Sequence, residues 1–161
     1  MIDITVKAHE PVVLPDDLNF ELMSKDEIRE LISRVEKAME NGIQIEIPIE
    51  HHFSHKVYAR EMRVPKGTML VGKIHRFENL NILSSGEVTV ISIDGAKRVK
   101  APFTFVGSPG SKRLFYMHED TVWTTIHGTE ETDLEKIENK FIAKNYEELN
   151  ELTTEVKLCL G

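Results

Sequence analysis

Residues 66–88, KGTMLVGKIHRFENLNILSSGEV, decide the fold class of this chain. Glycines separate short runs of Val, Ile, Leu and Thr in this stretch, and the same texture continues through residue 128. Such punctuation is typical of the short strands of a small all-β barrel or sandwich. Alternate residues of an extended strand share a face, and one face here holds Met69, Val71, Lys73, His75 and Phe77. Lys73 and His75 should therefore point the same way, either into a polar cavity or into solvent.

A helix is predicted upstream of this stretch. Ser24 and Glu27 have the spacing of a capping box, in which each side chain binds the backbone N–H of the other residue. Apolar residues then recur at helical spacing from Ile28 to Met39, and Gly42 ends the pattern. The apolar stripe of this helix could cover an open barrel end or pair with a second subunit.

Two further elements flank the β-rich region. Isoleucines alternate with other residues over 43–49, which predicts a strand, although Pro48 restricts it to a sheet edge or a strand end. Apolar spacing predicts a helix over 133–142, broken near Asn145 and resumed over 146–156. No internal repeat and no low-complexity segment is present in the sequence.

Composition narrows the class of protein. The 161 residues carry a formal net charge of −7, and no run approaches the roughly 20 apolar residues that span a bilayer, which excludes a helical membrane protein. The first residues lack the pattern of a secretory signal, and the lone Cys159 cannot form an internal disulfide, so we expect a reducing cytoplasm. A sequence pI of about 5.5 argues against general nucleic-acid binding. When the chain is divided into residues 1–66, 67–129 and 130–161, only the middle segment has a net positive charge, and a site is expected there.

The quoted stretch resembles the first signature of the cupin superfamily. In that signature two glycines bracket two histidines and a glutamate that bind a metal ion. When Gly67 and Gly86 are set on the two glycines, Lys73, His75 and Asn79 fall on the three metal-ligand positions. The spacing matches the signature, whereas two of the three residue types differ from it.

A second segment, VGSPGSKR at residues 106–113, resembles the other cupin signature, which ends in a histidine. Arg113 falls where that histidine would stand, and the Pro109-Gly110 pair is one residue tighter than the usual spacing. Longer stretches within 51–138 also resemble a group of cupin-like proteins encoded by bacteriophages, which has no activity to transfer.

This resemblance implies a mainly β fold, a cupin-type jelly-roll β-barrel with an N-terminal helix and C-terminal helices. We expect an N-terminal extension with the helix over residues 1–42, the barrel over 43–130 and a C-terminal helical tail over 131–161.

The register implied by the resemblance brings Lys73, His75, Asn79 and Arg113 together inside the barrel. Two fixed cations oppose a divalent metal, so no cofactor is expected. Arg offers a planar fork of donors and Lys a point charge, and both suit carboxylate or phosphate. The hypothesis is a small anionic ligand at these residues. An inert barrel, whose charged side chains pair with each other or reach solvent, is the alternative.

Other histidines could serve a metal instead. The group of His51, His52 and His55 has the look of a ligand cluster, but it follows a β-patterned run and is better interpreted as a loop and strand start. His118 lies five residues after Arg113, on the opposite face of an extended strand. His75, His118 and His127 are thus the metal candidates that remain, with His127 able to line the wall.

The remaining reactive residues favour structural roles. Trp123 is interpreted as core packing and Cys159 as a bystander thiol, since no histidine neighbours it in sequence. Glu78, Glu119 and Asp120 have no evident partner and suit solvated strand ends. The sequence contains neither a nucleophile elbow nor a phosphate-binding loop.

Three functions follow from these interpretations. The first is a non-catalytic cupin-like protein of phage origin that binds a small anion. The second is a structural or accessory protein of a virion or other assembly, with the barrel as scaffold. The third is a metal-dependent cupin enzyme in which His75 joins some of His51, His52, His118 and His127. We expect a homo-oligomer or larger assembly in the (host) cytoplasm or the virion, without nucleic acid or membrane partners.

Overall fold

Strands dominate the chain from residue 49 to residue 143. The structure is a computed structural model, and it describes residues 5–8 and 18–150. The strands are β1 (Thr5–Ala8), β2 (Ile49–Ser54), β3 (Val57–Val64), β4 (Thr68–Val71), β5 (Ile74–His75), β6 (Asn79–Ser85), β7 (Glu87–Ser92), β8 (Gly95–Lys100), β9 (Phe103–Gly107), β10 (Leu114–Met117), β11 (Thr121–Gly128) and β12 (Ile142–Ala143). The helices are α1 (Lys25–Met39) and α2 (Leu134–Phe141).

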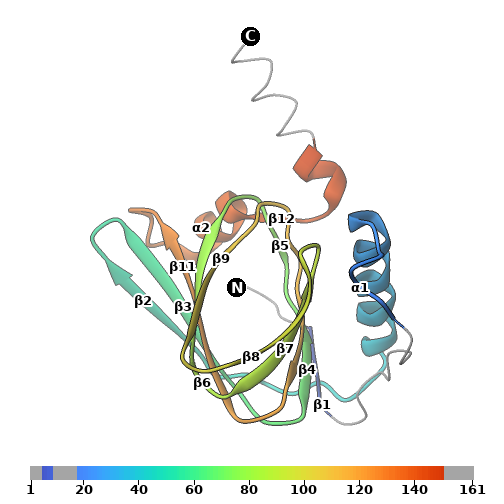
Figure 1. Cartoon of the computed structure of the whole chain (residues 1–161). Coiled ribbons are helices and arrows are strands. Elements are labelled where there is room, and N and C mark those ends of the chain that lie inside the picture. Colours follow the sequence, from blue (N-terminus) through green and yellow to red (C-terminus); the bar gives the residue numbers. More distant parts are fainter. Residues whose placement is uncertain (1–4, 9–17, 151–161) are drawn as a thin grey trace.

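The strand order defines a jelly roll. One sheet has the order β1-β4-β10-β7-β8 and the other β2-β3-β11-β6-β9, with antiparallel pairing throughout. The pairs are nested, because β7 pairs with β8, β6 with β9, β4 with β10 and β3 with β11. A long hairpin wrapped in this way across two sheets closes into the barrel seen in Figure 1. The predicted jelly-roll barrel is confirmed.

The barrel interior is filled from both sheets. Trp123 of β11 and Leu83 of β6 are fully buried there with Phe115 and Met117 of β10. Inward-facing residues alternate with outward ones along β11, as the pleat requires. Trp123 lies edge-on to Phe115, with ring centroids 4.9 Å apart. Its packing role is therefore as expected.

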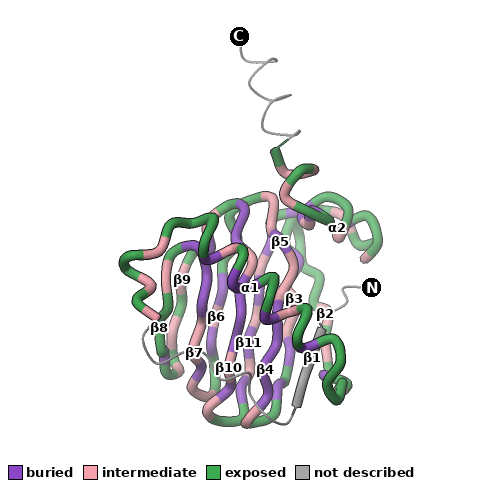
Figure 2. The backbone as a smooth tube through the Cα atoms, turned by 90° about the vertical axis from the view of Figure 1, so that its right-hand side faces the viewer, coloured by how far each residue is buried: buried purple, intermediate pink, exposed green. Residues whose placement is uncertain are grey.

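Helix α1 covers the outside of the first sheet. The predicted capping box of Ser24 and Glu27 is present, and Ile32 is buried on the inner face of the helix. A second hydrophobic cluster joins this face to Met69 and Val71 of β4. Figure 2 shows α1 lying across the strands of this sheet. The apolar stripe thus covers a barrel wall and not an open end.

The predicted strand over 43–49 is wrong for most of its length, because ladder pairing begins only at Ile49. Pro48 has no N–H to donate, although its carbonyl accepts a bond from the Arg63 N–H. Burial alternates over residues 44–50, since Ile47 is buried and Ile45 and Ile49 are partly buried while the residues between them are exposed. Ile43 departs from this pattern, because it is exposed. The segment is extended chain against the barrel without ladder hydrogen bonds.

The C-terminal helix ends one residue earlier than its apolar spacing predicts. Asp133 is the N-cap of α2, but Ile142 leaves the helix and pairs with His75 as part of β12. Pairing with β5 therefore takes the place of a further turn of helix at this point. Residues 146–150 are again helical, and Glu148 N donates to the Asn145 side chain. The rest of the predicted second helix, 151–156, lies outside the described residues.

The alternation along the quoted stretch changes phase at Gly72 and Lys73, which belong to no strand. Before the break Leu70 faces the barrel core, whereas Met69 faces α1. After it, Lys73 and His75 line the interior cavity described below. The prediction that Met69 shares a face with these two is therefore wrong. Among the described helices, none has the length and apolarity to cross a membrane.

Candidate functional site

An inner cavity of about 50 Å³ lies between the barrel core and α2. Its floor belongs to the core cluster of the barrel and its roof to a small cluster that contains Ile137 and Phe141 of α2. The lining residues are Tyr58, Arg60, Met62, Leu70, Gly72, Lys73, His75, Arg113, Phe115, Trp123, Thr125, His127, Ile137, Glu138, Phe141 and Ile142.

Two arginines put positive charge on this cavity. Arg113 is only 5% exposed, and its burial lowers its pKa from 12.5 to about 10, while Asp94 acts in the opposite direction. Burial also lowers the pKa of Arg60, and the charges of Tyr58 and Glu138 oppose this shift. Both groups remain protonated at neutral pH. Nε and Nη2 of Arg60 are buried and have no hydrogen-bond partner in the described part of the chain.

A buried amide network holds Arg113 in place. Nη2 of Arg113 donates to Oδ1 of Asn79 at 3.1 Å, and the same oxygen accepts from Nδ2 of Asn81 at 2.6 Å. Asn81 in turn accepts from Nε1 of Trp123 at 3.3 Å and from Oγ1 of Thr125 at 3.1 Å. This network connects β6 and β11 to the loop that carries Arg113. Its geometry fixes where the guanidinium can lie.

Two stacked histidines form another part of the wall. The rings of His75 and His127 are 5.6 Å apart, and His127 stacks on Phe141 at 4.4 Å. Burial, followed by the charges of Arg113 and Arg60, lowers the pKa of His127 to about 4. Burial also places the pKa of His75 well below its usual value, and the charges of Arg113, His127 and Arg60 act in the same direction. Both imidazoles are neutral at pH 7.

The ion pair of Lys73 and Glu138 divides the inner cavity from a larger outer basin. The basin, of about 600 Å³, shares Gly72, Lys73, Glu138 and Ile142 with the inner cavity. Arg76 lines the basin and binds the segment that follows α2. Its Nε donates to the Ile142 carbonyl at 2.9 Å, and its Nη2 donates to Glu148 at 2.7 Å. The Lys73 and Glu138 side chains are 28% and 18% exposed. This pair therefore lies at the boundary between the outer basin and the inner cavity.

The structure brings three of the four expected site residues to the cavity: Lys73, His75 and Arg113. Asn79 is 3% exposed and acts behind them, as the acceptor that holds Arg113. His127, the wall candidate, lines the same cavity. His118 does not line the cavity. Its Nε2 lies 2.8 Å from Oγ1 of Thr89 in β7.

Sequence reasoning missed Arg60, although a signal was present. Alternation in β3 places it with Tyr58 and Met62, which are buried at 1% and 4% exposure, so an arginine falls on an otherwise apolar face. Glu138 was missed too, because only the folding of α2 over the barrel brings it to Lys73.

The first histidine group does not gather around one point. His51 and His52 lie in β2, and His55 lies in the turn to β3. Nδ1 of His51 is 2.9 Å from the Tyr58 hydroxyl, and burial lowers the pKa of His51. The interpretation of this group as a strand and loop is confirmed.

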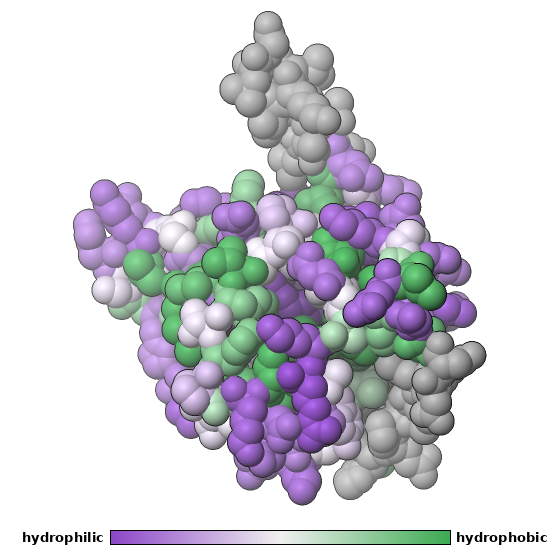
Figure 3. Space-filling model, in the orientation of Figure 1, coloured by the Kyte–Doolittle hydropathy of each residue, from purple (hydrophilic) through white to green (hydrophobic). Residues whose placement is uncertain are grey.

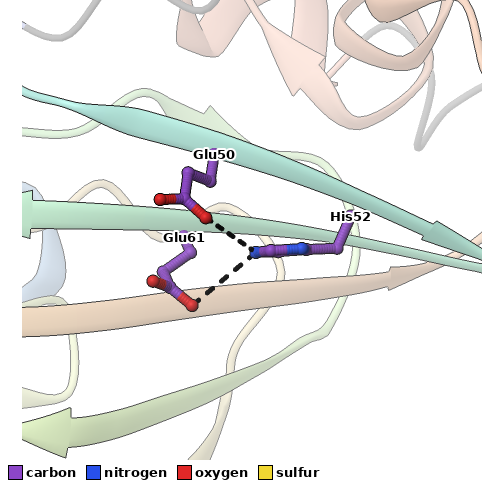
Figure 4. Close-up of side chains that lie close together, drawn as sticks. All are labelled: Glu50, His52 and Glu61. Atoms are coloured by element: carbon purple, nitrogen blue, oxygen red, sulfur yellow. Dashed lines mark ion pairs between the residues drawn. The ribbon is translucent and has the colours of Figure 1, made fainter.

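His52 belongs to a separate cluster outside the barrel, which Figure 4 shows. Its Nε2 lies 3.9 Å from Glu50 and 3.7 Å from Glu61, residues that face each other across β2 and β3. The three groups could hold a metal ion by their spacing. However, Arg63 pairs with both carboxylates, at 3.8 and 2.5 Å, and two of the three side chains are more than half exposed. The cluster is satisfied by that arginine.

A third hollow, of about 360 Å³, opens beside β8 and β9. Val106, which is 60% exposed, contributes to its lining, and hydrophobic residues gather over the β9 side of the barrel in Figure 3. Phe105 connects this hollow to the inner site, since the Arg113 guanidinium lies 5.5 Å from the centre of its ring. The hollow carries Asp94 and Lys97 as its charged groups.

No family model matches the chain, and a search of curated proteins found no match. Several solved structures are similar to it. KdgF from Halomonas sp. is 12% identical with a TM-score of 0.47, over 56% of this chain and 87% of that one. An RmlC-like cupin from Shewanella frigidimarina is 19% identical with a TM-score of 0.45, over 56% and 88%. An acetylacetone dioxygenase from Acinetobacter johnsonii is 15% identical with a TM-score of 0.43, over 51% of this chain and 59% of that one.

At these identities the likeness concerns the fold alone, and the chain spans little more than half of the dioxygenase. The nested strand order and the enclosed site between the sheets define a cupin-type jelly-roll barrel. Lys73 and Arg113, which the sequence resemblance aligns with metal ligands of the cupin signatures, both line this cavity.

Proposed function

We propose that this protein binds a small anionic ligand in its inner cavity, without a metal ion and without catalysing a reaction. The observation that carries this proposal is the charge of the cavity wall. The wall carries three cations, which are Arg60, Arg113 and Lys73. It carries one carboxylate, Glu138, which forms an ion pair with Lys73. Glu138 also acts on Arg60, but it is one negative charge against three positive ones, so the wall keeps a net positive charge.

The unpartnered N–H donors of Arg60 also favour an anion site. A buried polar atom without a hydrogen-bond partner costs about 1–3 kcal/mol, and more for a charged group, so such atoms call for an explanation. A bound anion would accept from them and offset the charge. His75 and His127 also keep buried Nδ1 atoms without a partner in the described chain, and these could contribute further contacts.

The same wall does not fit the metal that the cupin signatures imply. His75 and His127 are the neutral nitrogen ligands available on the cavity, with Glu138 as the carboxylate. Arg60 and Arg113 would repel a divalent cation bound to these histidines, just as their charges lower the pKa values of both imidazoles. The positive charge of the cavity wall therefore suits an anion better than the metal ion that the cupin signatures imply.

A thermal-shift screen against carboxylates, phosphate and sulfate tests the proposal. A ligand at a hundred times its dissociation constant should raise the free energy of unfolding by about 2.7 kcal/mol. Arg113→Ala should abolish the shift while the protein still folds. Arg98→Ala is the matched control, because Arg98 is 58% exposed on β8 and does not line the cavity.

Elemental analysis of protein purified without chelator completes the test. We expect no stoichiometric transition metal. A full equivalent of metal that His75→Ala removes would overturn the proposal in favour of a metal-dependent enzyme. Absence of any anion-dependent shift would overturn it in favour of the scaffold role in a virion or other assembly.

A further inference from the structure

The class of the ligand can be inferred from how the inner cavity distributes its polar groups. This inference rests on the proposed anion site. Nε and Nη2 of Arg60 form one edge of the guanidinium, and both are buried without a partner among the described residues. That edge offers two parallel N–H donors, an arrangement that matches the two oxygens of one carboxylate.

The cations occupy only part of the wall. The rings of His75 and His127 lie 5.6 Å apart, and Arg60 and Arg113 line the same cavity. The floor is different, because Leu70, Met62 and Trp123 belong to the hydrophobic cluster of the barrel.

Inorganic phosphate would suit this cavity poorly. Its oxygens would meet apolar side chains on the floor and lose hydration without replacement there. A carboxylate needs donors at one end only, and a short hydrocarbon end would gain from contact with Leu70 and Trp123.

The cavity also limits the size of the ligand. One water molecule needs roughly 10–15 Å³ of such space, so about 50 Å³ accepts on the order of four water-sized groups. A carboxylate with one or two further carbons, which has four or five non-hydrogen atoms, fits this limit. Longer chains would have to displace the roof residues Ile137 and Phe141.

We infer that the ligand is a short-chain carboxylic acid, held with its carboxylate on the Nε and Nη2 edge of Arg60 and its hydrocarbon end on the floor formed by Leu70, Met62 and Trp123.

Trp123 provides the readout, because it is the only tryptophan of the chain and lines the cavity. Its fluorescence is titrated with formate, acetate, propionate, butyrate and hexanoate, and with phosphate and sulfate at the same ionic strength. Affinity should rise about fourfold for each added CH₂ up to propionate, and fall from butyrate to hexanoate. Phosphate and sulfate should bind at least tenfold more weakly than the best carboxylate.

Arg60→Lys tests the donor edge, since it keeps the charge but removes the fork. We expect the affinity for propionate to fall between tenfold and a hundredfold. Arg63→Lys is the matched control on the same strand, where Arg63 is 54% exposed and pairs with Glu50 and Glu61 on the outer face. Leu70→Val should move the preferred chain length up by about one carbon.

The outcomes are separable. Tight phosphate or sulfate binding with weak carboxylate binding would overturn the carboxylic acid and leave the anion site intact. Binding of every carboxylate with equal affinity would overturn the apolar floor. Unchanged binding in Arg60→Lys would overturn the donor edge. Binding of no anion at all would overturn the proposed function itself.

Discussion

A Cβ atom placed on Gly107 would lie 1.7 Å from Nη2 of Arg113. It would also come within 2.9 Å of Oδ1 of Asn79, the acceptor of the same guanidinium. Real Cβ atoms do not approach other atoms so closely, and Asn79 is itself held by the buried amide network. The end of β9 therefore leaves room for the arginine of the site.

Gly107→Ala should consequently displace Arg113 from the cavity wall. We expect anion binding to be lost as completely as in Arg113→Ala, which isothermal titration calorimetry would measure. Gly128→Ala is the matched control, because no atom lies within 4 Å of the added Cβ there. Normal binding in Gly107→Ala would show that Arg113 is free to move and is not fixed by this contact.

The stability of the protein should fall as the pH drops from about 6.5 to about 4. His127 has a lowered pKa of about 4 in the folded protein, against 6.5 in the unfolded chain, so the unfolded chain binds more protons in this window. The loss attributable to His127 approaches about 3 kcal/mol at the acid end. Burial is the main cause, followed by Arg113 and Arg60.

Urea unfolding at pH 7.0 and pH 4.5 checks this expectation. His127→Gln cannot take up the proton and should lose less stability between the two pH values than the wild type. His75 adds to the same slope, since its pKa is also lowered, so part of the dependence should remain in the variant. Equal losses in both proteins would contradict the assignment to His127.

Glu138→Gln should strengthen anion binding. The change removes the negative charge at the boundary of the cavity and releases Lys73 from its ion pair. We expect the affinity for an anion to rise roughly tenfold, equivalent to about 1.4 kcal/mol. Glu135→Gln on the exposed side of α2 gives the control, and calorimetric titration distinguishes them. Weaker binding in Glu138→Gln would indicate that the carboxylate itself holds the ligand.

Asn81→Leu should destabilise the barrel by about 2–4 kcal/mol. The substitution leaves the Trp123 N–H and the Thr125 hydroxyl without their acceptor, and both groups are buried. Chemical denaturation measures the loss. Ser84→Ala provides the comparison on the outer face of the same strand, where the hydroxyl makes one bond of 3.5 Å. A loss below 1 kcal/mol would mean that water replaces the amide.

Local patterns predicted the architecture well. The capping box at Ser24 and the glycine-separated runs after residue 66 depend on short-range geometry, which the sequence displays directly. Pro48 shows the limit of such patterns, because alternating burial persisted there without strand pairing. A hydrophobic period reports which side chains are buried, and it does not report which N–H groups find partners.

The site was harder to predict, because its parts come from distant segments. Lys73 and His75 reached the cavity only after a break in the strand at Gly72 and Lys73 reversed the alternation, and a glycine alone does not tell which face the following residues take. Glu138 arrived through the folding of α2 onto the barrel. Arg60 was different, since the face that it shares with Tyr58 and Met62 was readable from the sequence.

The short ladder between β5 and β12 has a consequence for motion. It contains two residue pairs, supported by the Arg76 N–H on the Phe141 carbonyl, and so is a small unit to hold a roof in place. Small units of this kind open more often than the sheets around them. The amide hydrogens of Arg76 and Ala143 should therefore exchange with deuterium faster than those of β11. Their exchange should become slower when a ligand occupies the inner cavity.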